Sequence, residues 1–157
     1  MHPMKKCFSL LLAVIPFLSF AQTNDSAWVV NNYTKTETMV PMRDGTKLFT
    51  TIYAPKDNTE KHPILLERTP YSCWPYGENI FRSYWNSPRM YFLKENYILI
   101  IQDVRGRWMS EGVFEDVRPY IPNKKPAQVD EATDTYDAID WMVKNVNNNN
   151  GNVGVFG

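Results

Sequence analysis

The sequence predicts an α/β fold in which an antiparallel hairpin forms one edge of a sheet and the later strands are parallel. Three observations support this prediction. Asp44-Gly45 separates two strand-like runs, which is the strongest short-range signal for a hairpin. Three later runs are short and continuously apolar, as expected for strands buried on both faces. Segments of helical character lie between those runs, and such alternation favours a parallel sheet.

The first elements are a short helix and the hairpin. Asp25-Ser26 can cap a helical turn over residues 28–33. Residues 34–42 alternate and are rich in Thr and Val, which indicates a strand. Residues 43–46 form the predicted turn, and residues 47–53 form the return strand.

The parallel part of the sheet follows. Strands are expected at residues 63–67, 97–101 and 153–156, and helices at residues 89–96 and 131–146. The second helix has apolar residues at helical spacing, and Asp130 or Thr133 can cap it. The four asparagines at 147–150 predict a turn into the last strand. Residues 68–88 and 104–128 have no clear period and form long loops.

Ligands of open parallel sheets bind beyond the carboxyl ends of the strands. Three connections leave those ends here, after Glu67, after Ile101 and after Phe156. The first two are the long aromatic and charged loops, and they hold nearly all the polar groups that could form a site.

The N-terminus has the pattern of a signal peptide at residues 1–21. Lys5 and Lys6 precede an apolar stretch of ~13 residues, and Ala21 ends a small-x-small cleavage pattern. The stretch is short of the ~20 residues that span a bilayer. We therefore expect a periplasmic or secreted protein of residues 22–157. Cys73 is then the one remaining cysteine, so no internal disulfide is expected.

Composition excludes several functions. The hydrophobic fraction of 43% is enough for a core, and 17 basic residues balance 17 acidic ones without a basic stripe. We expect no nucleic-acid partner and, after cleavage, no membrane partner. No Cys/His cluster has ligand spacing, so neither a metal nor a cofactor is expected. Cys73 and Ser110 each lack a partner base, because His62 is the one histidine outside the signal peptide and is expected in an exposed position.

The two long loops supply the candidate site residues. Tyr71 follows the first apolar strand and could donate a hydrogen bond to an oxyanion, although the local pattern alone favours a packing tyrosine. Asp103 and Arg105 leave the second strand and are expected to brace the loop by pairing with each other or with backbone, with Gly106 permitting a positive φ. Trp74, Arg105 and Glu111 are candidates for a substrate-pocket wall. The acidic residues along the helix at 131–146 are expected to form a solvated face.

Five stretches, taken in order, resemble one enzyme family. They are VPMRDGTKLFTTIYAP, PILLERTPY, YILIIQDVRGRWMSEGVFED, DEATDTYDAIDWMVKN and NGNVGVFG, and they cover most of residues 36–157. The chain resembles the Xaa-Pro dipeptidyl-peptidase and cocaine-esterase-like serine hydrolases, and within them most closely the α-amino acid ester hydrolases, also called acyltransferases or glutaryl-cephalosporin acylases.

The resemblance implies that residues 22–157 are the N-terminal portion of an α/β-hydrolase catalytic domain. Gly157 matches the first glycine of the nucleophile elbow, so the catalytic Ser, Asp and His would follow it and the chain would be truncated at the elbow. Tyr71 matches the tyrosine that completes the oxyanion hole. The implied reaction is two-step acyl transfer on an ester or amide bond, with no activity in this portion alone.

The expected partner is a small-molecule or peptide substrate with an ester or amide bond, such as an α-amino acid ester, a peptide or a β-lactam side chain. A homo-oligomeric full-length protein is compatible with the sequence. Two alternatives remain open, an Xaa-Pro dipeptidyl-peptidase and, in another class, an exported binding domain without catalysis.

Overall fold

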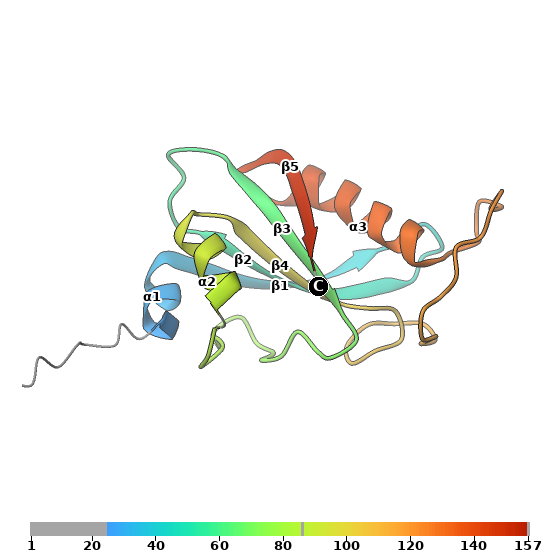
Figure 1. Ribbon diagram of the computed structural model, residues 1–157, viewed down its shortest axis with the longest axis horizontal. Helices are drawn as coiled ribbons and strands as arrows, with labels where there is room; N and C mark the ends of the chain where they lie inside the picture. Colours follow the sequence, from blue (N-terminus) through green and yellow to red (C-terminus); the bar gives the residue numbers. More distant parts are fainter. Residues whose placement is uncertain (1–24, 86, 157) are drawn as a thin grey trace, which may run out of the picture.

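The computed structural model describes residues 25–85 and 87–156, so the predicted signal peptide and Gly157 lie outside the described residues (Figure 1). The elements in chain order are α1 (Asp25–Asn32), β1 (Tyr33–Pro41), β2 (Lys47–Pro55), β3 (His62–Thr69), α2 (Ser87–Lys94), β4 (Ile98–Asp103), α3 (Glu131–Asn145) and β5 (Asn149–Phe156). All eight predicted elements are present, with bounds shifted by a few residues.

The five strands form one mixed sheet in the order β1-β2-β4-β3-β5. β1 and β2 are the antiparallel hairpin, and β2 also pairs antiparallel with β4. β3 pairs parallel with both β4 and β5. The predicted α/β class, with an edge hairpin followed by parallel strands, is therefore confirmed.

Local sequence explains the turn and the longest helix. The amide of Met42 donates to the Thr46 carbonyl over 2.8 Å, and Gly45 takes the positive φ of +85° that the hairpin turn requires. At α3, Asp130 is the N-cap: its carboxylate accepts from the Thr133 amide, while the Thr133 hydroxyl accepts from the Asp130 amide. Both predicted caps thus act together, as a capping box.

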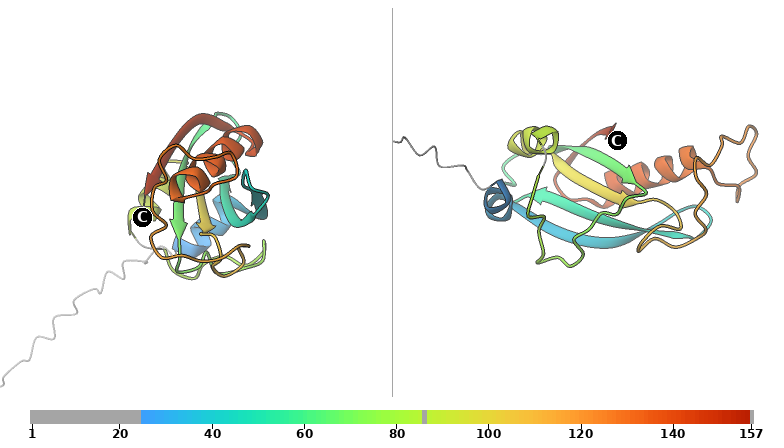
Figure 2. Two further views of the ribbon diagram at one scale, coloured as in Figure 1. Left: turned by 90° about the vertical axis from the view of Figure 1, so that its right-hand side faces the viewer. Right: turned by 60° about the horizontal axis from the view of Figure 1, so that its bottom comes forward.

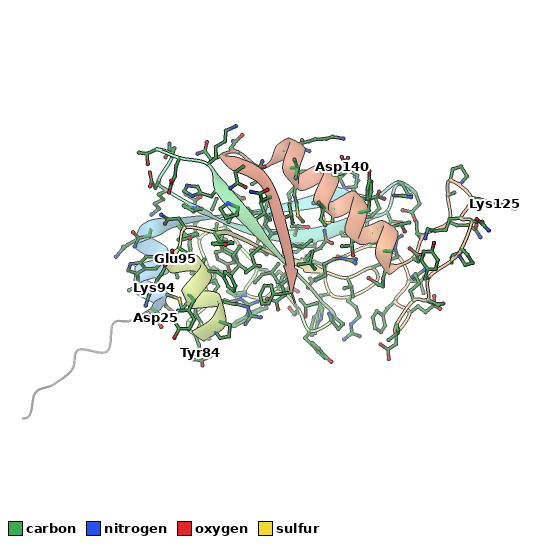
Figure 3. All side chains as sticks on the ribbon, turned by 45° about the horizontal axis from the view of Figure 1, so that its top comes forward. Asp25, Tyr84, Lys94, Glu95, Lys125 and Asp140 are labelled. Carbon is green, nitrogen blue, oxygen red and sulfur yellow. The ribbon has the colours of Figure 1, made fainter. Side chains whose placement is uncertain are left out.

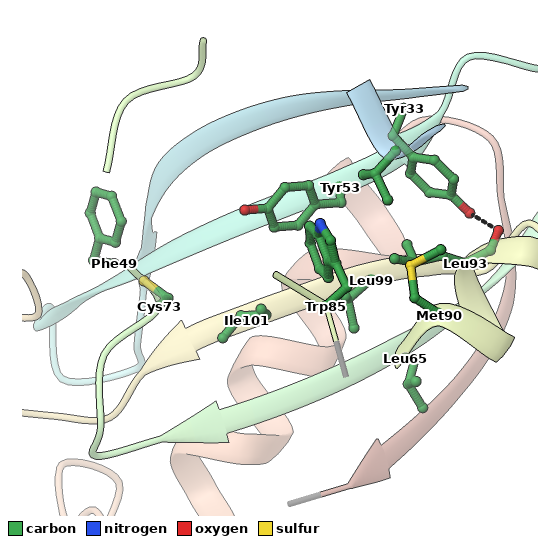
Figure 4. Close-up of a cluster of buried hydrophobic side chains, with 11 residues drawn as sticks. Tyr33, Phe49, Tyr53, Leu65, Cys73, Trp85, Met90, Leu93, Leu99 and Ile101 are labelled. Atoms are coloured by element: carbon green, nitrogen blue, oxygen red, sulfur yellow. Dashed lines mark hydrogen bonds between the residues drawn. The ribbon is translucent and has the colours of Figure 1, made fainter. Parts of the chain in front are cut away.

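Two apolar clusters sandwich the sheet, and the alternation of side chains along the strands separates them. Ile64, Leu66, Ile98 and Ile100 face α3, where they meet Ala138, Met142 and Val146. Leu65, Leu99 and Ile101 face the other side, where α1, α2 and the loop after β3 supply Val29, Cys73, Trp85, Met90 and Leu93 (Figures 2 and 4). The Tyr33 hydroxyl closes this side by donating to the Leu93 carbonyl over 2.6 Å.

Three expectations about the parallel strands are wrong. β5 is not buried on both faces: among the described residues it pairs only with β3, and Val155 is 53% exposed because no further strand or helix covers it. Asn149 and Asn150 also belong to this strand, and the turn is confined to residues 147–148.

His62 is not exposed. It is 2% accessible, because it begins a central strand and one ring nitrogen bonds the Asp57 carbonyl at 3.0 Å.

The α3 face of the sheet supplies a direct test of this packing. Leu66 is fully buried in the centre of the cluster. We expect Leu66→Ala to lower the free energy of unfolding by about 2–5 kcal/mol, through lost burial and the cavity that remains. Val143→Ala on the exposed side of α3 should change it by less than about 0.5 kcal/mol. Urea unfolding of both variants measures the difference, and equal effects would contradict this arrangement.

Candidate functional site

The carboxyl ends of the parallel strands meet at one edge of the sheet. Thr69, the last residue of β3, pairs with Asp103, the last residue of β4, and the Val104 amide donates to the Thr69 carbonyl over 3.1 Å. β5 runs in the same direction and its end reaches the same edge (Figure 1). The loops that begin at residues 70 and 104 therefore start side by side, as predicted from the sequence.

Tyr71 lies on the first of these loops and points into solvent. Its side chain is 85% exposed, and its hydroxyl has no hydrogen-bond partner among the described residues. The backbone is held, because the Tyr71 amide donates to the Thr69 hydroxyl over 3.0 Å. Cys73, two residues further on, is fully buried. The packing role that the local pattern favoured for Tyr71 is therefore wrong, and an exposed donor stands beside the strand ends.

Asp103 turns toward this loop and not toward Arg105. Its carboxylate accepts from the Cys73 amide at 2.8 Å, from the Tyr76 hydroxyl at 3.2 Å and from the Met109 amide at 3.4 Å. The expected pairing of Asp103 with Arg105 is wrong, while its bonds to loop backbone are confirmed. Side chains alternate along β4, so Asp103 faces the side of the sheet opposite to α3.

Arg105 is a buried ion-pair centre. Its Nε and Nη2 donate to the Asp134 carboxylate at 2.9 and 2.7 Å, and its Nη1 donates to Asp44 at 2.8 Å. The pKa of the Arg105 guanidinium is raised because it bonds Asp134, an effect that outweighs desolvation. Burial alone would raise the pKa of Asp44, but the bonds from Arg105 and Thr46 prevail and lower it. The arrangement ties the hairpin turn, the second loop and α3 together.

The prediction that the acidic residues along α3 form a solvated face is right only in part. Asp134 is fully buried against Arg105, and Asp137 accepts a two-pronged bond from Arg43 in the hairpin turn. Glu131 pairs with Arg68 at 2.7 Å. The Glu131 and Asp140 side chains are 41% and 48% exposed, and Asp140 pairs with Lys144 as expected for a solvated face. The helix itself was predicted correctly, but the basic residues that pair with its carboxylates come from strands and turns that are distant in sequence.

The remaining candidates brace the second loop or lie beside it. Glu111 accepts from the Lys47 amide at 2.9 Å and so joins the loop to β2. Gly106 has a φ of +70°, as predicted, and a Cβ there would approach the Phe114 amide nitrogen to 2.1 Å. Trp74 is 60% exposed on the first loop. A pocket-wall role for Trp74, Arg105 or Glu111 remains a prediction, and every nitrogen of the buried Arg105 guanidinium already donates to Asp44 or Asp134.

Arg107 and Trp108 contact the first loop, and the sequence analysis did not predict these contacts. Both side chains donate to the Pro70 carbonyl, from Arg107 Nε at 3.1 Å and from Trp108 Nε1 at 2.9 Å. The guanidinium of Arg107 also lies 4.8 Å from the centre of the Phe114 ring. These residues are 37 and 38 positions from Pro70, so only the pairing of β3 with β4 could have indicated the contact.

No complete nucleophilic set is present among residues 25–85 and 87–156. His62 begins β3, a full strand away from Tyr71. The Ser110 hydroxyl donates to the Asp103 carbonyl, and burial raises the pKa of the Cys73 thiol to about 12. The described residues also hold no group of three or more side chains able to bind a metal. A hollow of about 470 Å³ beside His62 and Trp141 lies at the opposite ends of the strands.

Comparisons with known proteins give consistent matches. The family described as X-Pro dipeptidyl-peptidase (S15 family) matches residues 44–157. Cocaine esterase from Rhodococcus sp. (strain MB1 Bresler) is 34% identical over 120 residues, which are 76% of this chain and 18% of that protein.

Solved structures agree with these matches. An α-amino acid ester hydrolase is 38% identical, with a TM-score of 0.70 over 96% of this chain and 24% of that one. An aminopeptidase from a marine sediment Thaumarchaeota archaeon is 36% identical, with a TM-score of 0.70 over 92% and 23%. The chain therefore spans about a quarter or less of the length of these relatives.

The Arg105 centre yields a stability prediction. Replacing Arg105 with Met removes the donors to both oxygens of the buried Asp134 carboxylate and leaves only the longer ion pair with Arg68 at 3.9 Å, so we expect a loss of about 3 kcal/mol in the free energy of unfolding. Combining Arg105→Met with Asp134→Asn removes the stranded charge and should recover part of that loss. Lys144→Met, at the exposed pair with Asp140, is the control and should have a much smaller effect. Denaturant unfolding measures all three, and a tolerated Arg105→Met would contradict the buried pairing.

Proposed function

The chain belongs to the X-Pro dipeptidyl-peptidase (S15) family of hydrolases, and from this premise we propose that it forms the N-terminal part of the catalytic domain of a serine hydrolase. The proposed enzyme cleaves ester or amide bonds through an acyl-enzyme. The chain's share of 24% of an α-amino acid ester hydrolase supports the view that the domain continues in a longer protein.

One observation supports the site assignment above others: Tyr71 is an exposed hydroxyl donor on a fixed backbone at the carboxyl edge of the parallel strands. In the proposed reaction a serine hydroxyl attacks the substrate carbonyl while a histidine takes its proton. The carbonyl oxygen becomes negatively charged in the tetrahedral intermediate. The Tyr71 hydroxyl donates a hydrogen bond to that oxygen, first when the acyl-enzyme forms and again when water or an amine releases it.

The nucleophile is proposed to follow β5. This strand ends at the same edge as β3 and β4, where a strand-to-helix turn exposes the serine in α/β-hydrolases. The Asp and His partners of the serine would also come from later residues. Neither a metal nor a cofactor takes part in this chemistry.

The proposed substrate is a small ester, in line with the two esterases among the relatives, a cocaine esterase and an α-amino acid ester hydrolase. The alternative is a peptide with an Xaa-Pro bond, which the family description and the related aminopeptidase favour. Both use the same acyl transfer, and they differ in the pocket that receives the acyl group.

Export to the periplasm or the medium is part of the proposal. It is supported by the pattern of two lysines, an apolar stretch and a small-x-small site in residues 1–21, which lie outside the described residues. Within the described part of the chain, no helix is both long and apolar enough to cross a bilayer.

Tyr71→Phe tests the catalytic assignment. In the full-length hydrolase we expect kcat for ester hydrolysis to fall by ~10²-fold, because loss of one oxyanion donor costs about 3 kcal/mol in the transition state. KM should change little, since the bond strengthens only as the oxyanion forms. Tyr91→Phe, at an exposed tyrosine on α2, is the matched control and should keep the parental kcat. An unchanged kcat in Tyr71→Phe would refute the assignment.

A second prediction concerns residues 22–157 produced alone. Because the nucleophile and its base are proposed to lie in later residues, this portion should release no product from an activated ester such as p-nitrophenyl acetate above the buffer rate. If the folded portion released p-nitrophenol faster than a heat-denatured sample at the same concentration, these residues would contain a nucleophile and the proposal would be overturned.

A further inference from the structure

The backbone directly after Tyr71 is strained. Ser72 has a φ of +90°, a conformation that residues with a side chain rarely adopt. Such residues persist only where the surrounding structure imposes the conformation, and they gather at functional sites. The turn at Ser72 has a visible result: Tyr71 is directed into solvent, while Cys73 on the other side of the turn is fully buried.

A chain of hydrogen bonds imposes this turn, and its direction follows from the chemistry of its last member. The Asp103 carboxylate can only accept, so the Tyr76 hydroxyl donates to it over 3.2 Å. The Tyr76 oxygen must then accept from the Ser72 hydroxyl, at 2.8 Å. The Ser72 oxygen in turn accepts from the Trp74 amide, at 3.0 Å. The Trp74 amide, the Ser72 hydroxyl and the Tyr76 hydroxyl are therefore linked in series to Asp103.

Asp103 also holds the loop directly. Its second carboxylate oxygen accepts from the Cys73 amide at 2.8 Å. The side chain is fully buried, and so is Cys73. The Tyr76 ring packs edge-on against Phe49 at 5.3 Å, which fixes the phenol that bridges Ser72 and Asp103. A buried charge with several donors is a strong restraint, because charge-assisted bonds exceed neutral ones.

The residue before Tyr71 is held from the second loop, and Asp103 organises that loop as well. Arg107 and Trp108 donate to the Pro70 carbonyl. The Met109 amide donates to the Asp103 carboxylate, and the Ser110 hydroxyl donates to the Asp103 carbonyl over 2.6 Å. One residue therefore anchors both flanks of Tyr71, whose side chain is 85% exposed.

We propose that Asp103 is the positioning residue of the oxyanion donor: its buried carboxylate holds the strained turn at Ser72, and thereby keeps the Tyr71 hydroxyl at the reacting carbonyl. This inference rests on the proposed role of Tyr71. The Asp103 side chain is fully buried behind the turn, so in this proposal its removal lowers the rate by displacing Tyr71 and not by losing a contact with the substrate. A displaced donor weakens the bond that forms in the transition state, which lowers kcat and leaves substrate binding nearly unchanged.

The test is a double-mutant cycle in the full-length hydrolase with an ester substrate. Asp103→Ala removes every side-chain acceptor and should lower kcat by ~10²-fold, with KM changed by less than about twofold. Asp103→Asn keeps one acceptor for the Cys73 amide and should fall between Asp103→Ala and the parent. In a Tyr71→Phe background, Asp103→Ala should lower kcat by less than about threefold more, because the donor is already gone. Asp140→Asn, on the outer face of α3 (Figure 3), is the matched control.

The outcomes separate the two proposals. If Tyr71→Phe leaves kcat unchanged, the proposed function fails whatever Asp103 does. If Tyr71→Phe lowers kcat but Asp103→Ala does not, or lowers it by the same factor in both backgrounds, the positioning role is overturned. Non-additive losses support it.

A second variant keeps the test decisive if both Asp103 variants fail to fold. Tyr76→Phe keeps the ring and removes only the hydroxyl that links Ser72 to Asp103. It should lower kcat by about tenfold in the Tyr71 background and not in the Tyr71→Phe background. A thiol reagent, with the label located by mass spectrometry, should also modify Cys73 faster in Tyr76→Phe than in Asp140→Asn. An unchanged kcat, or equal labelling rates, would contradict the proposal.

Discussion

The parallel pairing of β3 with β4 is the constraint on which the rest of this structure depends. Its register sets Thr69 opposite Asp103, so the two strands end level with each other. Two loops that are 34 residues apart in sequence thereby start at one point, and contacts between them become possible. Tyr71, Asp103 and the pair Arg107–Trp108 are neighbours for this reason. A shift of this register by one residue would turn the side chains of one strand to the opposite face of the sheet, and these residues would no longer be neighbours.

Because side chains alternate at the end of β4, the adjacent residues Gln102 and Asp103 make their hydrogen bonds on opposite faces of the sheet. Gln102 faces α3, where it accepts from Arg68 and donates to Thr50. Asp103 faces the opposite side and restrains the loop that carries Tyr71. Beyond the strand, Arg105 returns to the α3 side and joins two carboxylates. The sheet edge is therefore stabilised by ion pairs on one face, while a hydrogen-bonded turn on the other face presents the candidate donor.

Sequence patterns predicted the elements and their order because hairpin chemistry, apolar runs and helix caps are local signals. The Asp44-Gly45 turn, the run at Ile98 and the capping box at Asp130 all lie where short-range rules place them. Burial of charged and polar residues was predicted poorly. His62 and Asp134 are buried because distant partners satisfy them, and no local pattern reveals such partners. The exposure of Tyr71 was missed for the same reason, since it follows from a strained turn that Asp103 imposes across the sheet. The family resemblance is the signal that made Tyr71 a candidate, and its catalytic role stays a prediction.

An oxyanion hole needs a hydrogen-bond donor in the right direction and surroundings of low dielectric constant. The exposure of Tyr71 means that the described chain can supply only the first of these. A hydrogen bond to a developing charge gains most in a medium of low dielectric constant, and a phenol that is 85% exposed still faces water. If Tyr71 is the oxyanion donor as proposed, the described chain directs it through a backbone held by Thr69, while the water-excluding surroundings would come from groups that close over it, including the bound substrate. A substrate with a bulky apolar acyl group would exclude water from the phenol itself, so the strength of this one hydrogen bond would depend on the substrate as well as on the protein.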